Sequence, residues 1–222
     1  MNVGVLLAAG ASSRMGSSKP LVRWKGQSFL AHGVRTLWAA CDIVIVVLGA
    51  DAKRVQKGIE DEFTLLVEAG ALTPDLHAAR KHGARGLELR FEIHRGWKKG
   101  MLSSAQAGLA AAVKLKPASV LVLPVDHPEV KAETVQQLVA MMAQAMGSFG
   151  SKAAGGFAYA LVPRHRRRRG HPIVLSPALA RVVAKERDAR DLADAVRGHA
   201  RLIGYHDVAD GGVVRNRNTP AR

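Results

Sequence analysis

The chain has 222 residues, 48% of them hydrophobic, and its 33 Lys and Arg against 18 Asp and Glu leave a formal net charge of +15. This length suits one α/β domain that buries a full core. The composition excludes a disordered basic tail, collagen, a coiled coil and a disulfide scaffold. The charge leaves two interpretations, a protein that handles polyanions or a very basic solvated surface.

One cysteine, Cys41, excludes an intramolecular disulfide, and the sequence has no CxxC or Cys/His cluster for a soft metal. A reducing cytoplasm is therefore the expected compartment. The longest apolar runs, residues 3–9 and 43–48, are far shorter than the roughly 20 residues that a membrane helix needs. We expect no membrane span, and no secretory signal, since no Lys or Arg precedes the first run.

Apolar runs alternate with stretches of helical periodicity through the first two thirds of the chain. This alternation is typical of βα units that build a buried parallel sheet. Ser28 is a good N-cap for one of the helices. We predict strands at residues 2–9, 42–48, 87–94, 119–124 and 156–162, and helices at 28–40, 51–62, 74–84, 101–114 and 131–146.

The last third of the chain is less regular. Ser176-Pro177, after a short apolar run at 173–175, is a helix-start signal. We predict helices near 178–184 and 189–199, a strand at 201–206 and an extended tail at 210–222. The expected fold is a single three-layer, doubly wound α/β domain with a mostly parallel sheet, covering residues 1–222.

A small-residue loop follows the first predicted strand and reads Gly10-Ala11-Ser12-Ser13-Arg14-Met15-Gly16-Ser17-Ser18-Lys19-Pro20. Backbone amides converge at the carboxyl end of a first strand, and glycines let a phosphate approach closely. Arg14 and Lys19 add positive charge. The spacing matches neither a P-loop nor GxGxxG. The loop thus predicts a phosphate site of another kind, and the alternative is a flexible turn with solvated charges.

An acidic turn, Val125-Asp126-His127-Pro128, ends the later apolar run at 119–124. Mg²⁺ prefers carboxylate and phosphate oxygens and keeps several waters, so one Asp at the carboxyl end of a central strand can suffice. The alternative is an Asx-type turn. His127 has no partner His or Cys at ligand spacing, so we expect it to serve packing or the turn.

Two further segments carry glycine and charge. Residues 96–104, with Gly100 and Ser104, precede a helix whose N-terminus suits an anion, although an ordinary capped helix is the alternative. Residues 164–169 are rich in arginine and lead into Gly170-His171-Pro172. Charge runs are usually solvated, and nucleic acid contact is the next interpretation.

Together these segments resemble the nucleotidyltransferases that act on molybdenum cofactor, which share a fold with the sugar-phosphate nucleotidyltransferases. The matching stretches are Leu7-Ala8-Ala9-Gly10-Ala11-Ser12-Ser13-Arg14-Met15-Gly16, Lys19-Pro20-Leu21 with Gly26, the Trp, Gly-Met and serine pattern at 97–104, Arg169-Gly170-His171-Pro172 and Asn216-Arg217-Asn218-Thr219-Pro220. The double alanine and the Arg-Gly-His-Pro segment favour the cytidylyltransferase branch over the guanylyltransferase branch.

The resemblance implies transfer of CMP from CTP to the phosphate of molybdopterin or molybdenum cofactor, with Mg²⁺ as cofactor and pyrophosphate as product. It implies Lys19, Arg14 and Asp126 as catalytic residues, Asp126 and Asn218 as metal ligands, and Arg169, His171 and Arg190 as acceptor-binding residues. It implies that the nucleotide contacts Ala8, Ala9, Gly10, Ser12, Arg14, Lys19, Gly100 and Ser104. Such transfer depends on positioning and charge neutralisation, so no Ser/His/Asp triad is expected.

The chain departs from the family pattern at three places. His94-Arg95 replaces Asn-Pro ahead of Trp97, and Glu186 and Asp188 replace Asp and Gly ahead of Ala189-Arg190. Residues 63–86 look like an insertion of about one strand and one helix.

Several functions therefore stay open. A guanylyltransferase on the same cofactor, or a transferase for another small phosphorylated acceptor, is the nearest alternative. A non-catalytic nucleotide-binding domain is another. A nucleic-acid-binding module rests on charge alone, with no binding motif and only 5% aromatic residues, so nucleic acid is not an expected partner. Whether a molybdoenzyme or its chaperone docks on the basic surface also stays open.

Overall fold

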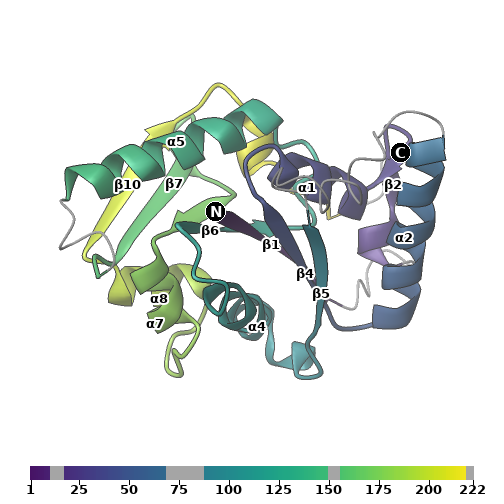
Figure 1. Ribbon diagram of the computed structural model, residues 1–222, viewed down its shortest axis with the longest axis horizontal. Helices are drawn as coiled ribbons and strands as arrows, with labels where there is room; N and C mark the ends of the chain where they lie inside the picture. Colours follow the sequence, from purple (N-terminus) through teal and green to yellow (C-terminus); the bar gives the residue numbers. More distant parts are fainter. Residues whose placement is uncertain (11–17, 69–87, 150–155, 219–222) are drawn as a thin grey trace, which may run out of the picture.

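The computed structural model describes residues 1–10, 18–68, 88–149 and 156–218. Its main sheet contains β1 (Asn2–Ala8), β4 (Ile43–Leu48), β5 (Glu88–Ile93), β6 (Ser119–Pro124), β7 (Tyr159–His165), β8 (Arg168–Arg169), β9 (Ile173–Leu175) and β10 (Leu202–Asp207). Seven of these strands follow the order β10-β7-β9-β6-β1-β4-β5, and β8 pairs with β7 (Figure 1).

The α-helices are α1 (Phe29–Trp38), α2 (Ala52–Glu68), α4 (Met101–Val113), α5 (Ala132–Ser148), α7 (Pro177–Val183) and α8 (Leu192–His199). Short 3₁₀ turns form at η1 (Lys19–Leu21), η3 (Trp97–Lys99) and η4 (Gly211–Val214). A separate antiparallel hairpin joins β2 (Arg23–Trp24) to β3 (Gln27–Ser28).

The sheet is mostly parallel. β1 lies between β4 and β6 and is parallel to both, β5 is parallel to β4, and β10 is parallel to β7. Only β8 and β9 run antiparallel to their neighbours within the described sheet. The carboxyl ends of β1, β4, β6 and β7 therefore lie at one edge, where ligands bind in open α/β sheets. The predicted fold class is confirmed.

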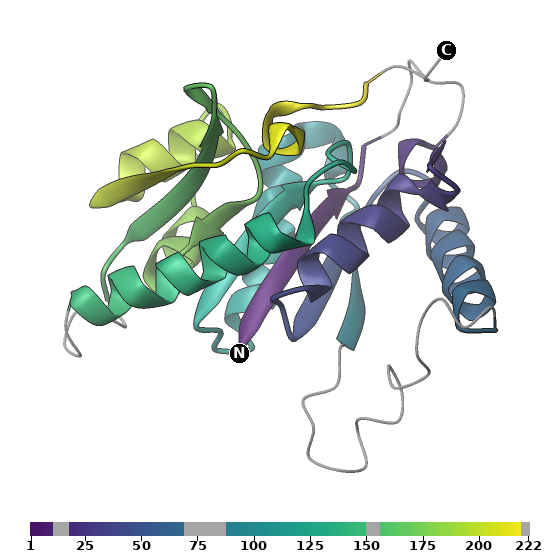
Figure 2. The same ribbon diagram turned by 90° about the horizontal axis from the view of Figure 1, so that it is seen from above.

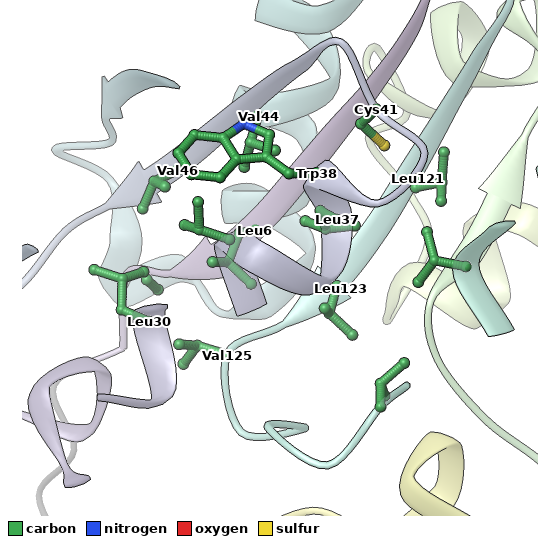
Figure 3. Close-up of a cluster of buried hydrophobic side chains, with 14 of the residues drawn as sticks. Leu6, Leu30, Leu37, Trp38, Cys41, Val44, Val46, Leu121, Leu123 and Val125 are labelled. Atoms are coloured by element: carbon green, nitrogen blue, oxygen red, sulfur yellow. The ribbon is translucent and has the colours of Figure 1, made fainter. Parts of the chain in front are cut away.

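Helices cover both faces of the sheet because its inner strands are apolar on both sides (Figures 1 and 2). Leu6 of β1 belongs to a buried cluster with residues of α1, α2 and α5, and Figure 3 shows it near Leu37 of α1. Val5 and Leu7, which point to the other face, pack with α4, α7 and α8. Full burial of one such side chain contributes roughly 1.5–3 kcal/mol.

Helix α4 lies unusually close to the sheet. A Cβ at Gly108 would come within 2.4 Å of Val5 Cγ1 and 2.7 Å of Val47 Cγ2, so only glycine allows this approach. The close packing fixes the beginning of α4 relative to the ends of β1 and β4. α4 is thereby placed at the edge of the sheet where the strands end.

Most predicted elements form, with shifted ends. Ser28 caps α1 by accepting a hydrogen bond from Ala31 N at 3.0 Å, and Ser176 caps α7. The hairpin β2–β3 was not predicted. Its turn at Lys25-Gly26 has φ of 47° and 84°, a pairing that suits a tight hairpin.

Two predicted segments have a different outcome. The beginning of the segment predicted as an insertion, 63–68, continues α2, and the helix predicted at 74–84 lies outside the described residues. The tail predicted as extended from 210 instead forms η4 at its beginning, because Asp210 caps that turn by accepting a hydrogen bond from Gly212 N at 2.8 Å. None of the described helices combines the length and the hydropathy that crossing a membrane requires.

Candidate active site

A pocket of about 350 Å³ lies at the carboxyl edge of the sheet. β1 and β6 are adjacent and parallel, with Leu7 opposite Pro124, so the residues after both strands reach the same place. Its lining residues are Leu7, Ala8, Ala9, Gly10, Lys19, Pro20, Trp97, Lys98, Gly100, Met101, Ser104, Pro124, Val125 and Asp126. The pocket thus brings together most of the residues that the sequence predicts for nucleotide and metal.

Three polar side chains from distant parts of the chain meet at this pocket. Lys19 Nζ lies 3.4 Å from Asp126 Oδ2 and donates a hydrogen bond of 2.5 Å to Asn218 Oδ1. The side chains of Lys19 and Asp126 are 19% and 20% exposed, so water screens their attraction only in part. One ammonium group therefore lies between a carboxylate oxygen and an amide oxygen.

The oxygens of Asp126 and Asn218 are chemically suited to a divalent cation. Both are hard donors of the kind that Mg²⁺ prefers, and both already face one positive charge. In the described part of the chain, no group of three or more His, Cys, Asp or Glu could hold a metal on its own. A cation here would need further oxygens from water or from phosphate, which fits the way Mg²⁺ binds nucleotides.

The beginning of α4 forms another wall of the pocket. Gly100, directly ahead of the helix, has φ of 103°, a conformation that favours glycine. Ser104 is buried, and Ser103 Oγ donates to Gly100 O at 2.8 Å. The free N–H groups and the dipole of a helix N-terminus attract anions, which agrees with the predicted phosphate contact.

His94, where the family pattern has Asn, is engaged within the protein. Its Nε2 lies 3.1 Å from Ser103 Oγ, so its ring holds the turn ahead of α4. Nothing in this contact points His94 at the pocket.

The predicted acceptor residues lie apart from one another. Arg169 is exposed in β8, where it pairs with Arg164 of β7. The ring of His171 packs against that of His127 at a tilt of 51°, with ring centroids 5.0 Å apart, and His127 Nε2 lies 3.8 Å from Asp126 Oδ1. His171 is therefore connected to the pocket through His127, which is buried and serves packing as predicted.

Burial first, and then the neighbouring His127, lower the pKa of His171 to about 3. The pKa of His127 is also lowered, chiefly by burial, against an opposing attraction from Asp126. Both rings are thus neutral at pH 7. His171 can donate a hydrogen bond to the acceptor substrate or accept one from it, but it brings no positive charge.

Arg190 is not brought to the pocket. It is exposed and forms an ion pair with Asp194 one helical turn later, with Nε 3.2 Å from Oδ2. Ser12 and Arg14 lie outside the described residues.

Several residues that hold the segments around the site together were not predicted from the sequence. Glu129 accepts hydrogen bonds from Arg215 and Arg217, and Arg217 also lies over the ring of Trp24. Asp210 receives Lys131 N and Thr134 Oγ1, both at 2.9 Å. Only Asp210 had a signal in the sequence, as an Asp ahead of two glycines.

A larger and more open hollow of about 940 Å³ lies between α5 and the segment from β10 to η4. Glu133, Asp207 and Asp210 line it, and the carboxylate oxygens of Asp210 accept hydrogen bonds from backbone N–H groups and from Thr134 Oγ1. The smaller pocket is the better candidate, because strand ends, a helix N-terminus and the Lys19 cluster converge there.

Comparison with known proteins agrees with this geometry. The sequence pattern of the MobA-like NTP transferase domain matches residues 4–203, which is most of the chain. The chain belongs to this family. It is accordingly a nucleotidyltransferase.

Two curated relatives differ in name. The chain is 32% identical over 193 residues to a nicotine blue oxidoreductase of Paenarthrobacter nicotinovorans, covering 84% of this chain and 78% of that protein. It is 36% identical over 58 residues to a probable molybdenum cofactor guanylyltransferase of Bacillus cereus, covering 26% of this chain and only 29% of that protein.

Solved structures show the same fold. A nucleotidyl transferase from Methanothermobacter thermautotroptrophicus superposes with a TM-score of 0.69 at 17% identity, covering 99% of this chain and 92% of that one. Rv0371c from Mycobacterium tuberculosis, in a structure with manganese, gives a TM-score of 0.61 at 18% identity, covering 93% and 88%.

Proposed function

We propose that this nucleotidyltransferase transfers CMP from CTP to the phosphate of molybdopterin or molybdenum cofactor and releases pyrophosphate. The observation that carries the proposal is the meeting of Lys19, Asp126 and Asn218 at a pocket walled by Gly10 and Gly100. A cation and two oxygen donors beside flexible glycine backbone suit a triphosphate with its metal.

The chemistry needs little from the protein beyond positioning and charge. An oxygen of the acceptor phosphate attacks the α-phosphorus of CTP, and the bond from that phosphorus to the bridging oxygen breaks. Pyrophosphate leaves with the electron pair. Lys19 would neutralise charge that develops on the phosphate oxygens, and the N–H groups at the beginning of α4 would add to this. Mg²⁺ held by Asp126 and Asn218 would withdraw further negative charge from those oxygens.

The choice of CTP rests on the resemblance of two sequence segments to the cytidylyltransferase branch, the double alanine Ala8-Ala9 and Arg169-Gly170-His171-Pro172. Ala8 and Ala9 line the pocket, and Ala9 O accepts a hydrogen bond from Ala50 N at 3.1 Å. The relatives named guanylyltransferases make GTP the alternative base.

On the acceptor side, we propose that Arg169 binds the phosphate of the pterin through its positive charge. His171 is proposed to contact the acceptor as a neutral hydrogen-bonding group. Arg14 and Ser12 are proposed to bind phosphate from the loop after β1. A molybdoenzyme or its chaperone remains a proposed partner for the product.

Pyrophosphate release with each of the four NTPs, Mg²⁺ and purified molybdopterin tests the proposal. We expect release with CTP that stops when either the acceptor or Mg²⁺ is left out. Preference for GTP would replace the cytidylyl assignment with the guanylyl one. No release with any NTP would overturn both.

A redox function is the second candidate, because the relative that aligns over 193 residues is named an oxidoreductase. The same preparation is tested by following NADH oxidation with a redox dye as electron acceptor. Turnover there, together with no pyrophosphate release, would favour the redox function.

A further inference from the structure

The segment from Arg215 to Asn218 reaches the pocket from the far end of the chain. Backbone contacts hold it and the turn ahead of it, where His171 N donates to Val213 O at 2.8 Å. Arg217 N donates to Asp126 O at 2.8 Å, and Gly212, just ahead of the segment, packs so closely that a Cβ there would lie 2.2 Å from Glu129 O. Side chains of the segment add further contacts.

Glu129 accepts the hydrogen bonds that hold the two arginines of this segment. Its side chain is only 12% exposed, yet each of its two oxygens accepts a hydrogen bond from a different arginine. Arg215 Nη1 lies 2.5 Å from Oε2, and Arg217 Nε lies 2.7 Å from Oε1. Charge-assisted hydrogen bonds to a largely buried carboxylate are stronger than ion pairs in open water.

Arg217 is held from a second side by Trp24. Its guanidinium lies 5.2 Å from the centre of the Trp24 ring, within the range of a cation–π contact. The ring is itself fixed, because His32 packs edge-on at 5.0 Å and its Nε2 lies 2.8 Å from Trp24 O. The orientation of Arg217 is therefore set by two elements, the turn after β6 and the hairpin β2–β3.

The position of Asn218 depends on that of its neighbour Arg217. Within the described part of the chain, its one hydrogen bond is the contact of Oδ1 with Lys19 Nζ. Since Asn218 is exposed, little packing holds it in place. We infer that the contacts of the neighbouring residue Arg217 fix the position of Asn218.

We propose that Glu129 is a positioning residue: by fastening Arg217 and Arg215, it places Asn218 Oδ1 beside Asp126 and so completes the pair of oxygens for the divalent cation. This inference rests on the proposed function only in its metal step. The fastening itself is a property of the chain that can be measured without nucleotide.

Amide hydrogen exchange on the full chain, without ligand, tests the fastening. Glu129→Gln keeps the size of the side chain and removes its charge, so residues 215–218 should exchange about tenfold faster or more. α5 should not change. Glu133→Gln, the same substitution at an exposed position of α5, is the matched control and should leave residues 215–218 as they are. Unchanged exchange at 215–218 in Glu129→Gln overturns the proposal.

Mn²⁺ binding tests the consequence for the cation. Free Mn²⁺ is followed by electron paramagnetic resonance in the presence of CTP and without acceptor, so that no turnover occurs. Loss of a group that orients a metal ligand typically weakens metal affinity about 10- to 100-fold, and we expect this for Glu129→Gln. In an Asn218→Ala background the same substitution should add less than about twofold, since the ligand it positions is gone.

The outcomes separate the two proposals. Equal weakening by Glu129→Gln with and without Asn218, or a lower Tm with unchanged Mn²⁺ affinity, means that Glu129 is structural and overturns its positioning role. If the wild-type protein binds neither CTP nor Mn²⁺, the proposed function fails, and the exchange experiment alone decides whether Glu129 fastens the segment.

Discussion

Two regions of the molecule are rich in charged contacts, and they are built in opposite ways. At the pocket, Lys19 contacts Asp126, 107 residues away, and Asn218, 199 residues away. At the corner where α7 leads into α8, the contacts are local. Arg190 pairs with Asp194 four residues later, and Glu186 contacts His199 thirteen residues later.

The corner closes on itself. Glu186 Oε1 accepts hydrogen bonds from the backbone N–H groups of residues 187, 188 and 189, at 2.8, 2.6 and 3.2 Å. Its other oxygen contacts His199. A hollow of about 440 Å³ lies beside it, but the carboxylate faces its own backbone. Polar groups that satisfy one another locally build a turn, whereas groups brought together from distant strands leave oxygens facing a cavity.

The largest effect should come from the oxygen at the centre of the pocket. Asp126→Asn removes the charge with almost no change in size, and we expect pyrophosphate release to fall by about 10²–10³-fold, because a preorganised charge at the reacting phosphate is lost. Asp61→Asn, at an exposed ion pair on α2, is the control and should leave the rate unchanged. Full Mg²⁺-dependent turnover by Asp126→Asn would remove Asp126 from the mechanism.

Lys19 should come next. Lys19→Met removes the ammonium that lies between Asp126 and Asn218, so the KM for the nucleotide should rise and kcat should fall, by about 10²-fold in kcat/KM. Lys19→Arg keeps the charge but spreads it over a planar group, and it should recover only part of the loss. Steady-state kinetics with varied CTP measure both. Equal kinetics for Lys19→Met and wild type would contradict the role of this cation.

Residues directly after apolar strands were the predictable part of the site. Gly10 and Asp126 follow β1 and β6, and parallel strands end at the same edge, so their meeting could be expected from pattern alone. Asn218 was expected only from the resemblance to a family, because nothing in the residues between says that the chain returns.

Glu129 and Arg217 illustrate what could not be predicted. They meet across 88 residues without any periodicity, so only the folded chain brings them together. Arg190 was expected at the acceptor, but Asp194 lies one helical turn after it, and that spacing was a readable signal for a local pair.

Alanine substitutions at two glycines test how tightly α4, beside the pocket, and α8, at the corner, are packed. Gly108→Ala in α4 would force a Cβ to within 2.4 Å of Val5 and should destabilise the fold by about 1–3 kcal/mol. Gly198→Ala in α8 meets nothing within 4 Å and should stabilise it by roughly 0.5–1 kcal/mol, because alanine loses less backbone entropy in a helix. Urea unfolding measures both. Effects of equal sign would mean that the two helices are packed alike.

The corner should be the more sensitive region to acid. The hydrogen bond with His199 and then the backbone N–H groups lower the pKa of Glu186 from 4.5 to about 2. A folded-state pKa below the unfolded one means stability that is present above pH 4.5 and lost as the pH falls toward 2. Tm measured against pH should therefore drop more for wild type than for Glu186→Gln across this window. Parallel curves would show that the carboxylate contributes nothing there.

The smallest effect should follow the loss of Arg190. Its guanidinium is exposed and is already paired with Asp194, and such an exposed ion pair contributes little because water screens it. Arg190→Ala should change the KM for molybdopterin by less than about twofold, whereas Arg169→Ala should raise it, because Arg169 has no acidic partner among the described residues. Molybdopterin titrations of both variants measure the contrast. If Arg190→Ala raises the KM as much as Arg169→Ala does, the α7–α8 corner must move to the acceptor during the reaction. The ion pair between Arg190 and Asp194 would then be present only before the acceptor binds.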